Sequence, residues 1–147
     1  AVALREKLDD PVPLASTLYN LADTYRTQHD CTTALPLFKR AAKIGSETGK
    51  RLTLTAMSNA GIAVCAAKAH DWATATPAFN AAASDLEALD MKMYAAITRQ
   101  NWAELLGLDG QHAEARKQAQ LALALLKDLP PPADQVRGEL TEWLKKN

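Results

Sequence analysis

The stretches LYNLADTY, residues 18–25, and ALPLFKRA, residues 34–41, decide how this chain folds. In each stretch apolar residues recur three or four positions apart, a spacing that places them on one face of an α-helix. Large residues such as Leu18 and Phe38 alternate with small ones such as Ala22. Two helices with this alternation can approach closely and interlock, so we predict that the two stretches form one helical hairpin.

The same pattern recurs 41 residues further along the chain. This shift lays His29-Asp30 on His70-Asp71, and it also superposes Ala34 on Ala75, Pro36 on Pro77, Phe38 on Phe79 and Ala41 on Ala82. A further shift of 40 residues gives a looser copy, with Ala103, Ala115 and Ala122 in the small-residue positions. A fixed period of this length is typical of stacked helical hairpins. We therefore predict three hairpins, at residues 13–49, 51–89 and 91–128.

The two ends of the chain differ from the repeats. Residues 1–10 are predicted to be the tail of a preceding helix, which makes the chain part of a longer protein. The prolines of residues 130–132 end the last hairpin, because proline lacks an amide donor and restricts the residue before it. A final helix at residues 132–146 carries one apolar stripe and a polar outer face, as expected of a capping helix that seals the last repeat.

Composition limits the class of partner. The 147 residues include 17 basic and 17 acidic ones, so no net field attracts nucleic acid or an anionic membrane. No stretch has the roughly 18 uncharged apolar residues that a membrane helix requires, and no signal peptide is recognisable. For these two reasons we expect a cytoplasmic protein. We also expect an all-α fold, since aromatic residues make up only 5% of the chain and glycine is sparse.

Chemistry-bearing residues are few. His29 and His70 occupy equivalent turns beside Asp30 and Asp71, so we interpret these pairs as turn and capping residues and not as catalytic dyads. Cys31 and Cys65 lie in non-equivalent positions and lack metal-ligand spacing, and we expect a helix-start residue and a core residue, not a disulfide. No catalytic constellation, phosphate loop or metal motif is present, so we expect neither an enzyme nor a cofactor.

Two prolines recur at one position of the repeat. Pro36 and Pro77 fall about a turn and a half into their predicted helices, where proline removes a hydrogen bond. One interpretation is that a bend is built into the repeat. The alternative is that each helix begins later than predicted.

In these positions the sequence resembles the tetratricopeptide repeat family. The first copy supplies the family pattern in full, the second partly and the third most loosely; the first copy consists of Leu18, Leu21, Ala22, Tyr25, Ala34, Phe38 and Ala41. Its period of 40 to 41 residues is longer than the usual 34 and is similar to the long repeats of kinesin light chains and of polarity adaptors. The resemblance implies a right-handed α-solenoid of three hairpins plus a C-terminal capping helix.

The resemblance also implies where a partner binds. Family members bind on the concave face, which the first helix of each hairpin lines. The corresponding residues here are Ser16, Tyr19, Asn20, Asp23 and Arg26 in the first hairpin, Met57, Ala60, Gly61, Val64 and Lys68 in the second, and Ile97, Gln100, Asn101 and Glu104 in the third.

The expected function is that of a non-catalytic module that binds a peptide or helix of another protein. The apolar centre of the projected surface favours a ligand with an apolar middle, and amides such as those of Asn20 and Asn101 can hold a peptide backbone. One alternative is a structural spacer that self-associates through its N-terminal end. Another is a ligand-sensing repeat domain of a regulator. Neither nucleic acid nor a membrane is expected as a partner.

Overall fold

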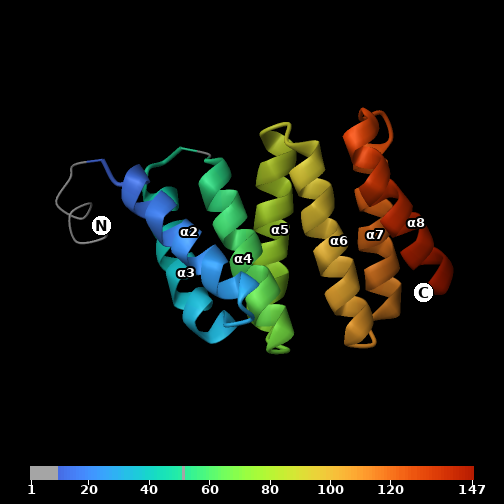
Figure 1. Cartoon of the computed structure of the whole chain (residues 1–147), viewed down its shortest axis with the longest axis horizontal. Coiled ribbons are helices and arrows are strands. Elements are labelled where there is room, and N and C mark those ends of the chain that lie inside the picture. The colour runs from blue at the N-terminus through green and yellow to red at the C-terminus, as the bar shows by residue number, and fades with distance from the viewer. Residues whose placement is uncertain (1–9, 51) are drawn as a thin grey trace. The chain divides into compact units, whose positions relative to one another are not determined.

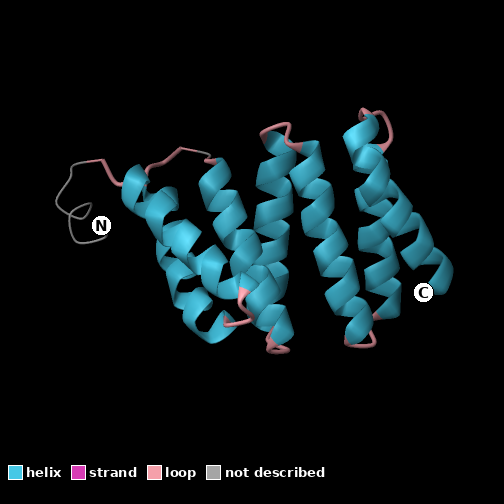
Figure 2. Ribbon diagram, viewed as in Figure 1, coloured by secondary structure: helices cyan, strands magenta, loops and turns pink. Residues whose placement is uncertain are grey.

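The computed structural model describes residues 10–50 and 52–147, and regular structure within these ranges is helical (Figure 2). The all-α class predicted from the sequence is therefore confirmed. The predicted tail at residues 1–10 falls almost wholly outside the described residues. In chain order the elements are α2 (Val12–Thr27), α3 (Cys31–Glu47), α4 (Thr53–Lys68), α5 (Trp72–Ala88), α6 (Lys92–Leu108), α7 (His112–Leu126), the 3-10 turn η1 (Pro131–Ala133) and α8 (Asp134–Lys146) (Figure 1).

The chain divides into two compact units within α5, the first ending at Asp85 and the second beginning at Leu86. We call them the N-terminal unit and the C-terminal unit and describe each by itself.

The core of the N-terminal unit depends on small residues that let large ones enter. Phe38 of α3 is fully buried, together with Ala22 of α2 and Ala34. A Cβ atom at Gly61 of α4 would lie 2.6 Å from the Phe38 ring, closer than real Cβ contacts occur. Glycine at position 61 is therefore required for the Phe38 ring to lie flat against the backbone of α4.

Leu21 departs from its predicted role. Its register equivalents Ile62 and Trp102 are buried, with exposed fractions of 8% and 3%, whereas Leu21 remains 39% exposed. The prediction that Leu21 belongs to the apolar core face of its helix is thus wrong, because the residues that the structure describes leave Leu21 exposed.

The C-terminal unit is closed by α8. Leu126, Val136 and Leu140 are buried in one cluster, and Trp143 and Leu144 pack against it. The apolar residues of the predicted final helix therefore face this cluster, while Lys145 and Lys146 at its end are exposed. Arg137 of α8 also donates a hydrogen bond to the Leu126 carbonyl at the end of α7.

A residue in the left-handed conformation follows each of the helices α2 to α6. His29, His70 and Asp90 have φ of 63°, 61° and 57°, and Gly49 and Gly110 have φ of 71° and 78°. After α2, the His29 amide donates to the Arg26 carbonyl, and the next amide donates to Tyr25, each at 2.9 Å, which is the Schellman pattern.

The aspartates that follow these histidines cap the next helices. The Asp30 carboxylate accepts from the Thr33 amide at 3.0 Å, and Asp71 accepts from Thr74 at 3.2 Å. The capping interaction holds the pKa of Asp30 below its ordinary value. The turn-and-cap interpretation of both His-Asp pairs is confirmed.

Pro36 and Pro77 lie inside α3 and α5, which begin at Cys31 and Trp72. The alternative that each helix begins later than predicted is therefore wrong.

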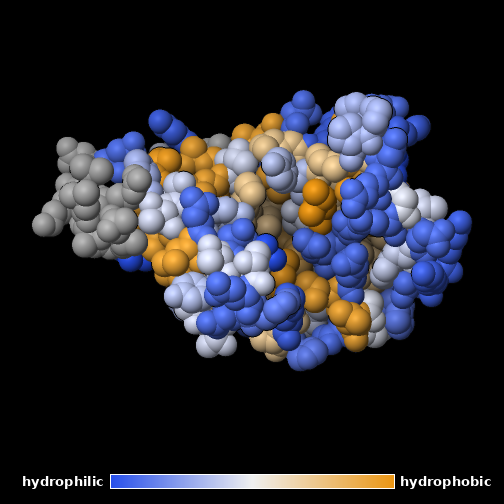
Figure 3. All heavy atoms as spheres, in the orientation of Figure 1, coloured by the Kyte–Doolittle hydropathy of each residue, from blue (hydrophilic) through white to orange (hydrophobic). Residues whose placement is uncertain are grey.

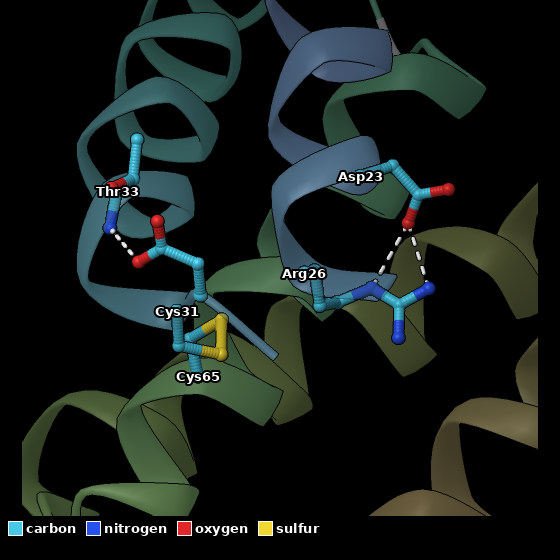
Figure 4. The surroundings of a disulfide bond; sticks show 6 residues. Asp23, Arg26, Cys31, Thr33 and Cys65 are labelled. Carbon is cyan, nitrogen blue, oxygen red and sulfur yellow. Dashed lines mark hydrogen bonds and ion pairs between the residues drawn. A yellow bond between two sulfur atoms is a disulfide. The ribbon is translucent and has the colours of Figure 1, made fainter. Parts of the chain in front are cut away.

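The expectation of unpaired cysteines is also wrong, because Cys31 and Cys65 form a disulfide with their Cα atoms 5.3 Å apart (Figure 4). The reason is the antiparallel packing of α3 and α4. Thr48, just after α3, lies midway between the two cysteines in the sequence, so the start of α3 lies beside the last turn of α4.

Candidate functional site

The N-terminal unit brings together the projected residues of α2 and α4, which pack against one another. On α2, Asn20 is exposed and Ser16 is half-buried. Tyr19 is half-buried and packs on Phe38, with ring centroids 5.8 Å apart and planes tilted by 54°. Because the ring of Tyr19 rests on a fully buried aromatic, its position is fixed by the core.

Asp23 and Arg26 form an ion pair one helical turn apart on α2. An Asp23 carboxylate oxygen accepts from Arg26 Nε at 2.9 Å and lies 2.7 Å from Arg26 Nη2 (Figure 4). The forked contact holds the guanidinium in one orientation. The two charges neutralise each other, so this part of α2 presents a polar but uncharged surface to a partner.

Helix α4 is apolar on nearly all sides. Met57, Ala60 and Val64 are half-buried, and Lys68 at the end of the helix is exposed. Gly61, which the resemblance placed on the ligand-facing surface, is buried against Phe38. That projection is wrong for Gly61, because its missing side chain makes room for the core.

The projected residues of α6 lie in the C-terminal unit, where α8 engages some of them. Gln100 is buried, and its Nε2 donates to Oε2 of Glu139 on α8 at 2.8 Å. Ile97 packs against the cluster that includes Leu140. These two side chains therefore contribute to the attachment of the last helix.

The remaining two projected residues of α6 differ in environment. Asn101 is half-buried and Glu104 is exposed. Partial desolvation raises the pKa of Glu104, and the negative charge of Glu139 raises it further. The surroundings of Glu104 thus disfavour its negative charge.

The C-terminal unit also contains an open cavity of about 460 Å³ that no sequence pattern predicted. It lies between the α5–α6 turn and the proline-rich segment before α8, with Tyr94, Met93 and Leu129 among its lining residues. Tyr94 is 47% exposed. The only signal in the sequence was a run of prolines, which marks a chain reversal but not a hollow.

Polar and apolar side chains are unevenly spread over the exposed surface. Figure 3 shows exposed apolar side chains in separate patches, and mostly hydrophilic side chains over α8.

No group of three or more histidine, cysteine, aspartate or glutamate side chains within residues 10–50 and 52–147 could hold a metal ion. Within the same residues, no helix is long and apolar enough to cross a membrane.

The comparison with family models identifies the repeat type. The tetratricopeptide repeat model matches residues 13–87, about half of the chain. Among curated protein sequences, none matches this chain.

Two solved structures share the fold. BtubC (BKLC) from P. vanneervenii superposes with a TM-score of 0.84 at 20% identity over 97% of this chain. A putative kinesin light chain from Podosopora anserina, with nearly identical TPR-like repeats, superposes with a TM-score of 0.74 at 14% identity over 95% of this chain. The chain spans 59% of the length of the first structure and 67% of the second. These matches confirm the helical-repeat fold and the similarity to kinesin light chains predicted from the sequence.

Proposed function

Because the chain belongs to the tetratricopeptide repeat family, a fold commonly used for protein interaction, we propose that it is a non-catalytic module that binds a peptide or helix of another protein. We place the binding surface on α2 and α4 of the N-terminal unit. We call it the α2–α4 surface, and its residues are Ser16, Tyr19, Asn20, Asp23, Arg26, Met57, Ala60, Val64 and Lys68.

One observation carries this proposal: α4 is apolar on more sides than its neighbours in the N-terminal unit cover. A helix that is apolar all round belongs in a core, because each exposed apolar side chain forfeits the free energy of burial. Met57, Ala60 and Val64 nevertheless keep part of their surface open to solvent. A bound segment with an apolar face would complete the burial of α4.

The polar residues of α2 suit the edge of such a site. Asn20 is exposed, and its amide can both donate to and accept from a peptide backbone. The Asp23–Arg26 pair adds fixed donors and acceptors without a net charge. Lys68 places a positive charge at the far end of α4. This arrangement favours an extended peptide or an amphipathic helix with an apolar centre.

Two of the projected α6 residues already serve the attachment of α8. Gln100 already donates to Glu139, and Ile97 already packs with the α8 cluster, so binding there would have to compete with the attachment of α8. Asn101 and Glu104 are the α6 residues that we propose as additional partner contacts.

A displayed peptide library tests the proposal without a known partner. Peptides are selected on the immobilised full chain and then titrated against three variants: Met57→Glu, Val64→Glu and Ala81→Glu. Ala81 is an exposed alanine on α5, so its substitution adds the same charge to the same unit on a helix that does not form the α2–α4 surface. Circular dichroism checks that each variant is folded.

We expect the selected peptides to lose at least about tenfold in affinity for Met57→Glu and Val64→Glu, because burying an unpaired carboxylate is costly, and to bind Ala81→Glu as they bind the parent chain. Unchanged binding to the two surface variants would place the site elsewhere.

A second candidate, a segment of a longer repeat protein that packs against another helix through α2, rests on Leu21. Its equivalents are buried by surrounding helices, whereas Leu21 is 39% exposed. Light scattering over a range of concentrations tests self-association through this face. If the mass rises with concentration in the parent chain and not in Leu21→Gln, this candidate is supported. A constant monomer mass in both would count against self-association.

A further inference from the structure

The two sulfurs of the disulfide have unlike surroundings. Cys31 is the first residue of α3 and is half-buried at the helix end. Cys65 lies within the last turns of α4, is only 2% exposed, and belongs to the apolar cluster of Ala22, Phe38 and Ile62. Cys31 also packs against this cluster but keeps part of its surface exposed, whereas Cys65 is almost wholly enclosed. A thiol or disulfide in solution therefore reaches Cys31 more readily than Cys65.

Electrostatics at the two positions differ as well. The amino-terminal end of α3 carries the positive end of the helix dipole, which favours a thiolate at Cys31. The adjacent Asp30 carboxylate opposes this effect, although its charge is already engaged by the Thr33 amide. The apolar cluster around Cys65 disfavours a thiolate at that position. Burial and charge thus both favour reaction at Cys31 over reaction at Cys65.

We propose that Cys31 is the site through which thiol–disulfide exchange enters and leaves the protein, with Cys65 as the resolving cysteine. The co-reactant is a low-molecular-weight disulfide or thiol, for which glutathione is a suitable probe. Cys31 is thus a modification site that carries a mixed disulfide before the bond to Cys65 forms.

In the oxidative direction the Cys31 thiolate attacks one sulfur of glutathione disulfide. A bond forms between Cys31 and glutathione, and one glutathione leaves as its thiolate. The Cys65 thiol then attacks the Cys31 sulfur and expels the second glutathione, whose departing thiolate takes the proton of Cys65. Two protein thiols have lost two electrons, and one glutathione disulfide has become two glutathione thiols.

In the reductive direction an external thiolate attacks the Cys31 sulfur, and Cys65 is the leaving group. The departing thiolate must form inside the apolar cluster, where its charge is poorly solvated, so this step is slow. A second thiolate then attacks the external sulfur of the mixed disulfide and releases Cys31. Opening of the native disulfide is therefore slowed by the burial of Cys65, while closing begins at an accessible sulfur.

Matched single-cysteine chains test the proposal. Cys65→Ala leaves only Cys31, and Cys31→Ala leaves only Cys65. Each full-length chain is incubated with glutathione disulfide under native conditions and in denaturant, and intact mass measures the gain of one glutathionyl group. We expect native Cys65→Ala to react at least about tenfold faster than native Cys31→Ala, and the two chains to react at similar rates in denaturant.

A measurement on the parent chain guards against misfolded variants. The reduced parent chain is exposed to a short pulse of iodoacetamide, and peptide mapping shows which cysteine is alkylated first. Preferential labelling of Cys31 supports the proposal. Equal labelling of both cysteines in the folded chain, or faster glutathionylation of Cys65 than of Cys31, would overturn it.

Discussion

The two units of the molecule use different means to join their helices. In the N-terminal unit, α3 and α4 are held by a disulfide and by the close packing of Phe38 on Gly61. In the C-terminal unit, polar side chains add bonds between helices: Arg99 of α6 donates to Gln118 of α7 at 2.6 Å and to Glu87 of α5 at 2.9 Å.

Polar hydrogen bonds also attach α8 to the other helices of the C-terminal unit. Gln100 of α6 donates to Glu139 of α8, and Arg116 of α7 donates to the Leu144 carbonyl at 2.9 Å. Hydrogen bonds that involve charged side chains respond to salt, whereas a disulfide responds to reductants. One repeat architecture can thus carry units that are sensitive to different conditions, and the following experiments address each unit in turn.

Removal of the disulfide is expected to have the largest effect. Closing a loop with a sequence separation of 34 residues stabilises the folded state by about 3 to 4 kcal/mol in the chain-entropy model. Cys31→Ser with Cys65→Ser should therefore weaken hydrogen-exchange protection of α3 and α4 and leave α7 and α8 unchanged. An equal loss of protection in both units would contradict the contrast between them.

Leu140→Ala should have the next largest effect, in the other unit. Leu140 is 1% exposed in the α8 cluster, and truncation of such a residue typically costs about 2 to 5 kcal/mol. Hydrogen exchange should increase in α7 and α8 first. Thr141→Ala, on the exposed side of the same helix, serves as the control and should change protection little.

Gly61→Ala should destabilise the N-terminal unit by about 1 to 3 kcal/mol, the usual cost of overpacking. The added methyl group would overlap the Phe38 ring, and the gain in helix propensity is smaller than this cost. Urea unfolding followed by circular dichroism measures the change. Combining Gly61→Ala with Phe38→Leu should recover part of the loss, since the smaller side chain makes room.

The smallest effect concerns Glu104, whose pKa is raised above its ordinary value of 4.5 by partial desolvation and by the charge of Glu139. The folded chain binds this proton more tightly than the unfolded chain, so stability falls as the pH rises through the interval between the two pKa values. Glu104→Gln should remove this part of the pH dependence. Thermal melts of both chains from pH 4 to pH 7 measure the difference, and parallel pH profiles would contradict the assignment.

Local features of the sequence predicted most of the fold. The spacing of Leu18, Ala22 and Phe38 indicated helices, and the recurrence of His29-Asp30 at 70–71 located the turns. These signals are short-range, because turn chemistry and capping depend on neighbours along the chain.

The features that the sequence did not predict depend on contacts between helices. The disulfide follows from α3 lying antiparallel to α4, and the Gln100–Glu139 bond follows from where α8 packs. Gly61 was projected onto the ligand-facing surface because the family pattern gives a position and not the size of the side chain opposite it. The symmetry of Cys31 and Cys65 about Thr48 was the one signal in the sequence that could have indicated the pair.

The disulfide also has a mechanical consequence. A repeat protein that connects two partners bears tension along its chain, and unfolding under load releases the contour length of each helix in turn. With Cys31 bonded to Cys65, the force bypasses the intervening segment, whose separation of 34 residues corresponds to roughly 110 to 120 Å of extended chain. This length stays hidden from a pulling force until a thiol opens the bond, so the chemical state of one sulfur pair sets how far the protein can stretch.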